Sequence, residues 1–216
     1  MALDRNIASS DVVQLMRAID FAARKHSDQR RKGRAKEPYI NHLTEVACLL
    51  AEATAGHDLV AVLGAILHDT IEDTNTTPAE LAATFGDEVA NLVAEVTDDE
   101  RLPKHERKLL QIDTAARKSA RARLIKIADK TSNLRSLVES PPEAWDSDRK
   151  REYVEWAARV VQECRGVNPW LEARFDEVYR RACSTARRRG RAHSGRSQVQ
   201  RHDERRRSRA ADNRTG

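Results

Sequence analysis

The chain has 216 residues, enough for one ordinary domain with a single substantial core. Charged residues make up 34% of it and aromatic residues 4%, which favours helices because strands draw on β-branched and aromatic side chains. No apolar run approaches the roughly 20 residues of a membrane span, and the N-terminus lacks the pattern of a signal peptide. We therefore expect an all-α cytoplasmic protein without a membrane partner.

The net charge of +5 is unevenly distributed along the chain. Residues 187–216 hold eleven arginines and three acidic residues, a net charge of +8, so residues 1–186 carry −3. The terminal segment has almost no large apolar residues, and we expect it to be disordered because it cannot offset its ordering entropy by burial. An Arg-rich tail predicts weak, nonspecific nucleic-acid contact. A charged extension without a specific partner is the alternative. The predicted domain spans residues 1–186.

Apolar periodicity and capping residues predict helices throughout that domain. Asp11 and Asp58 are candidate N-caps, and Thr77 followed by Pro78 and Glu80 has the pattern of a capping box. No alternating strand pattern stands out. The helices are expected at about 11–25, 41–55, 77–85, 87–97, 104–116, 120–138, 148–166 and 169–186. Another helix, which carries His68, is expected after the Asp58 N-cap.

The three cysteines are far apart, and none forms a Cys-x-x-Cys pair. This spacing indicates neither a thiolate zinc site nor a disulfide framework. Cys48 lies in an apolar stretch and is expected to be a small core residue.

The most informative stretch runs from His68 to Asp73 and follows the apolar run Val60–Leu67. That run is expected to be buried, so the polar groups should lie at the edge of a core. If the helix continues through Asp73, i,i+4 spacing places His68 above Glu72 and Asp69 above Asp73. Burying unpaired carboxylates is costly unless a cation or hydrogen bonds compensate. A solvated helix end is the alternative, but the added acids favour a metal site.

Two distant residues carry further suitable groups. His42 opens the second predicted helix, and Asp129 lies where the surrounding pattern places it near an apolar face. Taken singly, His42 would more often be a capping or half-buried histidine, and Asp129 an ion-pair partner of Lys126 or Lys130. Their occurrence together with the cluster at 68–73 indicates one shared site.

With these segments in order, the chain resembles the HD superfamily. Within it, the chain is similar to the Rel/Spo hydrolases that degrade the alarmones ppGpp and pppGpp, especially the small stand-alone metazoan SpoT homologues. The resemblance covers about residues 10–180 and implies an HD-domain helical bundle. The matching stretches are Arg30–Lys32, Pro38–His42, Leu67–Thr74, Phe85–Gly86, Val96–Asp99, Lys126–Arg135 and Glu152–Ala158.

The resemblance implies a metal site built from two imidazoles and two carboxylates. Such a set suits one borderline-hard divalent ion, for which the family implies manganese. The implied ligands are His42, His68, Asp69 and Asp129. The adjacent acids Glu72 and Asp73 are then general-base candidates that hold and deprotonate the attacking water.

The resemblance also implies a nucleotide pocket that combines cations with a platform for the base. Arg31 and Lys32 would lie along the nucleotide, with one side chain stacking on guanine. The alternative for residues 30–34 is a solvated basic loop. The residues expected to complete the pocket are Asn133, Arg149 and Tyr153.

Two departures from the family pattern bear on the site. Leu43 stands where most members have Pro after the ligand His. Thr131-Ser132 replaces bulkier residues, and this change is expected to widen the base pocket.

The expected reaction is hydrolysis of the 3′-diphosphate of ppGpp or pppGpp to GDP or GTP and pyrophosphate. No synthetase domain is expected, because the residues outside the HD segment are too few. One alternative keeps the site but acts as a phosphatase on NADPH or another nucleotide. The other is a non-catalytic alarmone or nucleic-acid binding module.

Overall fold

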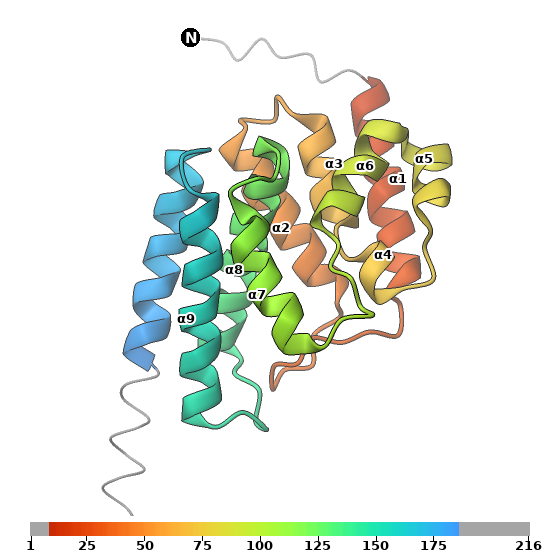
Figure 1. The fold of residues 1–216 in the computed structure, drawn as a ribbon. Coiled ribbons are helices and arrows are strands. Elements are labelled where there is room, and N and C mark those ends of the chain that lie inside the picture. Colours follow the sequence, from red (N-terminus) through yellow and green to blue (C-terminus); the bar gives the residue numbers. More distant parts are fainter. Residues whose placement is uncertain (1–8, 186–216) are drawn as a thin grey trace, which may run out of the picture.

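The computed structural model describes residues 9–185, and over that range the chain is helical (Figure 1). The predicted all-α class is confirmed. Within these residues the one pairing of extended backbone is an isolated bridge between Arg30 and Pro38. The labelled helices are α1 (Ser9–Lys25), α2 (Ile40–Ala53), α3 (Leu59–Leu67), α4 (Thr70–Asp73), α5 (Pro78–Phe85), α6 (Asp87–Val96), α7 (Lys104–Ala115), α8 (Ala120–Glu139) and α9 (Ser147–Cys164). A further helix occupies residues 169–185.

Two predictions concern residues outside this range: the disordered tail at 187–216 and its nucleic-acid contact. Among the described helices, none combines the length and the apolar character needed to cross a membrane.

Local capping explains where several helices begin. The Thr77 hydroxyl accepts a hydrogen bond from the Glu80 N–H at 3.1 Å, and the Asp58 carboxylate accepts one from the Ala61 N–H at 3.1 Å. Each such cap contributes about 1 kcal/mol. Asp11 lies in the first turn of α1 rather than at its N-cap, because the helix begins at Ser9.

Helix α3 forms the centre of the apolar core. Every residue from Ala61 to Leu67 is buried, as the apolar run predicts. Burying a Leu, Ile or Val side chain contributes about 1.5–3 kcal/mol. Gly64 lets α3 approach α6 closely, since a Cβ at this position would lie 2.6 Å from Leu92 Cδ2.

The helix does not continue unbroken from Leu67 to Asp73. It ends at Leu67, His68 and Asp69 form a turn, and α4 begins at Thr70. Side chains compete for the carbonyls that a continuous helix would use: His68 Nδ1 donates to Ala65 O at 2.8 Å, and Thr70 Oγ1 donates to Leu67 O at 2.6 Å. The continuous i,i+4 stack considered above is therefore replaced by a bend that carries His68 and Asp69.

Helix α8 runs through the middle of the bundle and packs against α2, α3, α6 and α9 (Figure 1). It brings buried polar groups into the interior, and such groups need partners to be tolerated there. These buried residues are Lys126, Asp129, Lys130, Thr131 and Ser132.

The expectation that Cys48 belongs to the core is wrong, because its side chain is exposed. The helical period explains the error: Ala47 and Leu49 on either side are buried, and Cys48 falls on the outer face of α2.

Candidate metal centre and its cavity

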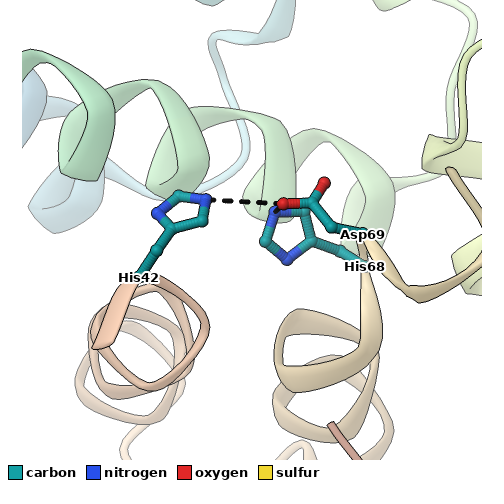
Figure 2. Close-up of side chains that lie close together, drawn as sticks. All are labelled: His42, His68 and Asp69. Carbon is teal, nitrogen blue, oxygen red and sulfur yellow. Dashed lines mark ion pairs between the residues drawn. The ribbon is translucent and has the colours of Figure 1, made fainter. Parts of the chain in front are cut away.

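Four predicted ligands from three elements converge at one point. His42 comes from the first turn of α2, His68 and Asp69 from the bend after α3, and Asp129 from the middle of α8. Figure 2 shows His42, His68 and Asp69 directed toward one another. Asp69 Oδ2 lies 3.7 Å from His42 Nε2 and 3.1 Å from His68 Nε2. Asp129 Oδ1 lies 3.3 Å and 4.0 Å from the same two nitrogens.

These separations fit a shared cation. Ligand atoms about 2.1 Å from one ion lie about 3 Å apart at right angles and about 4.2 Å apart when opposite. The chemistry of the donors agrees with the geometry, since imidazole and carboxylate suit a divalent transition metal. His68 Nε2 is buried and makes no hydrogen bond, although Asp69 Oδ2 lies near it. His68 Nδ1 donates to Ala65 O, so the Nε2 lone pair is available to a metal.

The carboxylates of the cluster stabilise a positive charge between them. Burial lowers the pKa of His68, but the Asp69 and Asp129 carboxylates outweigh it and raise that pKa to about 9. Burial raises the pKa of Asp69, but the charge of His68 outweighs it and holds this pKa well below its usual range. Burial lowers the pKa of His42. A proton on His68 thus balances the carboxylates where no metal does so.

The predicted acid pair lies beside this cluster. Glu72 Oε2 accepts a hydrogen bond from the Asp98 N–H at 3.2 Å, and Arg107 Nη1 lies 3.6 Å from Glu72 Oε1. Burial and the charge of Asp98 raise the pKa of Glu72 to about 7. Burial and the charge of Asp69 raise the pKa of Asp73. A carboxyl that titrates near neutrality can exchange protons with water at physiological pH.

A cavity of about 700 Å³ opens onto these groups. Its wall includes every predicted ligand except His42, together with both acids and all five residues expected to bind substrate. His42 has a side chain only 1% exposed and reaches the other donors from behind the wall.

The predicted substrate residues differ in their surroundings. Arg31 is buried and donates to Ser132 O at 3.4 Å, so the alternative of a wholly solvated basic loop is wrong for this residue. Arg149 lies 4.6 Å from the Trp145 ring. Burial raises the pKa of Tyr153 to about 12, which keeps its phenol protonated at neutral pH.

Close packing holds the loop that carries Arg31 and Lys32. A Cβ at Gly33 would lie 2.3 Å from Ser140 O, and the Ala35 N–H donates to Ser140 Oγ at 2.8 Å. The loop is thus attached to the C-terminal end of α8.

Asn133 has a second contact besides the cavity, because its amide donates to Asp129 Oδ1 at 2.5 Å. Thr131 and Ser132 do not widen the base pocket as expected, since neither lines the cavity. Thr131 Oγ1 donates to the backbone of its own helix at Ile127 O, and Ser132 Oγ contacts His42 Nδ1.

Lys130 Nζ pairs with Asp129 Oδ2 at 2.8 Å, as one alternative from the sequence had it, and lies 4.6 Å from the centre of the Trp156 ring. Several other cavity residues were missed from the sequence. Lys108 approaches the same ring at 4.8 Å. Trp145 and Lys104 also line the wall. The scarcity of aromatic residues was the available signal, because two of three tryptophans lie here.

Comparisons with known proteins agree with this arrangement. Residues 18–168 match the protein-family model described as the HD domain. The chain belongs to the HD-domain family. It is 48% identical over 171 residues to the human guanosine-3′,5′-bis(diphosphate) 3′-pyrophosphohydrolase MESH1, covering 79% of this chain and 96% of that protein. The Xenopus tropicalis protein of the same name is 47% identical over 171 residues, with the same coverage.

A solved structure has a similar fold. It is described as a metazoan orthologue of SpoT that hydrolyses ppGpp, and it matches with a TM-score of 0.75 and 43% identity. The match covers 77% of this chain and 94% of that one. The family resemblance inferred from the motifs is confirmed.

Proposed function

We propose that this protein is a Mn²⁺-dependent guanosine-3′,5′-bis(diphosphate) 3′-pyrophosphohydrolase. With water it would convert ppGpp or pppGpp into pyrophosphate and GDP or GTP. The observation that carries the proposal is a single cavity that combines converging imidazole and carboxylate donors with cations and aromatic rings. Similarity to proteins named for this activity, over 96% of their length, supports it.

His42, His68, Asp69 and Asp129 would hold the metal. When bound, a divalent ion lowers the pKa of a water molecule and polarises a phosphoryl oxygen. Two nitrogen and two oxygen donors suit a borderline-hard divalent ion, and manganese is proposed because the family resemblance implies it. The buried His68 Nε2, which makes no hydrogen bond and faces Asp69 Oδ2 at 3.1 Å, supports a ligand role for this imidazole.

Glu72 is proposed to take the proton of the attacking water, with Asp73 holding that water. Its pKa of about 7 supports this role, because a base is efficient when its pKa lies near the working pH. Arg31 and Lys32 would bind the diphosphates, while Arg149 and Tyr153 would hold the nucleoside. Positioning of this kind converts binding energy into rate.

Asn133 is proposed to act at the boundary between metal and substrate. Its amide donates to the Asp129 carboxylate and also faces the cavity. An amide so placed would fix the orientation of Asp129 and contact the ribose or a phosphate.

The test is product analysis with the purified full chain, ppGpp and Mn²⁺. We expect GDP and pyrophosphate in equal amounts, and loss of both when EDTA is added. Glu72→Gln should retain bound metal and lose most turnover. Glu155→Gln is the matched control, because Glu155 is exposed on α9 and does not line the cavity.

Turnover that persists in EDTA or in Glu72→Gln would contradict the proposal. A parallel incubation with NADPH addresses the alternative substrate. Phosphate released from NADPH, with ppGpp left intact, would replace the alarmone assignment by a nucleotide phosphatase that uses the same residues.

A further inference from the structure

A chain of hydrogen bonds runs away from the metal cluster between α2 and α8. His42 Nδ1 lies 2.9 Å from Ser132 Oγ, and Ser132 Oγ donates to Glu45 Oε2 at 2.6 Å. Arg135 Nη1 pairs with the other carboxylate oxygen of Glu45. His42 and Glu45 lie three residues apart on α2, and Ser132 and Arg135 three apart on α8, so each pair shares one helix face.

The proton positions along this chain follow from the donors and acceptors. A serine hydroxyl has one hydrogen, and a carboxylate paired with a guanidinium can only accept. The Ser132 hydrogen is therefore directed at Glu45, and Ser132 Oγ must accept from His42 Nδ1. With its proton on Nδ1, His42 presents a bare Nε2 toward Asp69 and Asp129.

The burial of His42 and Ser132 keeps water from replacing their mutual contact. His42 is 2% exposed and Ser132 is 0% exposed, so water does not readily replace the serine as a partner for Nδ1. Glu45 and Arg135 are about 28% and 32% exposed, which lets the far end of the chain keep its charges partly hydrated.

We propose that Glu45 and Ser132 are positioning residues that fix the tautomer and ring orientation of His42 for metal binding. The inference rests on the proposed metal site but concerns residues to which the motifs gave no role in metal binding. In a metal-binding histidine, one ring nitrogen binds the metal and the other usually bonds a nearby residue. Mutation of that residue typically changes metal affinity by about 10–100-fold. Ser132 therefore does not shape a base pocket. It acts through His42.

The first test measures Mn²⁺ affinity by competition with a chromophoric chelator. Ser132→Ala should weaken binding about 10–100-fold, and Glu45→Gln should weaken it less, because an amide oxygen still accepts from Ser132. Thr131→Val is the matched control: it also removes a fully buried hydroxyl from α8, but that hydroxyl bonds Ile127 O. Circular dichroism identifies variants that fail to fold.

The second test reads the tautomer itself in metal-free protein. Long-range ¹H–¹⁵N spectra of histidine-labelled chain should show His42 protonated at Nδ1, and the Ser132→Ala variant should lose this single tautomer. Thr131→Val should leave the His42 signals unchanged.

The two tests separate the possible failures. Wild-type protein that binds no Mn²⁺ would remove the proposed metal function, while the His42 spectrum would still decide whether the hydrogen-bond chain sets the tautomer. Wild-type His42 protonated at Nε2 would overturn the inference. So would a folded Ser132→Ala variant whose Mn²⁺ affinity stays within twofold of wild type.

Discussion

Asp129 has a structural role that can be measured apart from catalysis. Its carboxylate pairs with Lys130 Nζ at 2.8 Å, and the lysine side chain is only 6% exposed. Asp129→Asn keeps the shape but leaves a buried ammonium without its acid partner. Breaking a buried pair in this way costs about 3–5 kcal/mol. The loss cannot exceed about 5 kcal/mol, because neutralising a lysine of pKa 10.4 at pH 7 costs about that much. Beyond this cost, Lys130 would release its proton and no unpaired charge would remain.

One feature of the site reduces the expected cost. The ring of Trp156 lies 4.6 Å from Lys130 Nζ and stabilises the cation. The relief of repulsion between Asp129 and Asp69 is offset by the lost attraction between Asp129 and the protonated His68. We therefore expect a loss of about 3 kcal/mol, which lowers the Tm by about 6–12 °C in a domain of this size.

Thermal unfolding in EDTA is the assay, since chelation separates this effect from metal binding. The Asp129→Asn/Lys130→Met double variant should recover more than half of the loss, because it removes the unpaired charge. Lys130→Met alone is the control that completes the cycle. Strict additivity of the two single changes would refute the argument that the pair is coupled.

The remaining predictions concern the metal, the base and the loop. His68→Ala should reduce bound Mn²⁺ from one ion per chain to a small fraction, measured by metal analysis after gel filtration; full occupancy would exclude His68 as a ligand. The logarithm of kcat/KM should rise with pH and then level, because Glu72 must lose a proton before it can act as the base. The pKa of Glu72 is raised to about 7 without a metal, and a bound cation would lower it, so the profile should level at about pH 7 or below. Glu72→Gln should lack this rise, and an unchanged profile would assign the base elsewhere. Gly33→Ala should raise KM for ppGpp several-fold with a smaller change in kcat, because its Cβ would lie 2.3 Å from Ser140 O and displace the loop of Arg31; unaltered steady-state kinetics would show that the loop adapts.

Local signals in the sequence were sufficient for the helices and for the ligand types. Thr77 and Asp58 cap helices because a capping side chain bonds backbone only three residues away. Seven of the eight residues in the apolar run at 60–67 are buried, as its composition indicates, and Val60 is half-buried. Cys48 shows the limit of composition, because a helix turns one residue of an apolar stretch outward.

Motifs and periodicity in the sequence were enough to predict the family, the helical class and the groups suited to bind a metal and move a proton. The distant partners of those groups depend on the tertiary structure. Glu45 and Ser132 are 87 residues apart, and Glu72 and Asp98 are 26 apart. Such contacts exist only where α2 crosses α8 or where α4 meets the end of α6. Because hydrogen bonding and burial depend on these crossings, the tautomer of His42, the pKa of Glu72 and the buried pairing of Lys130 follow from packing.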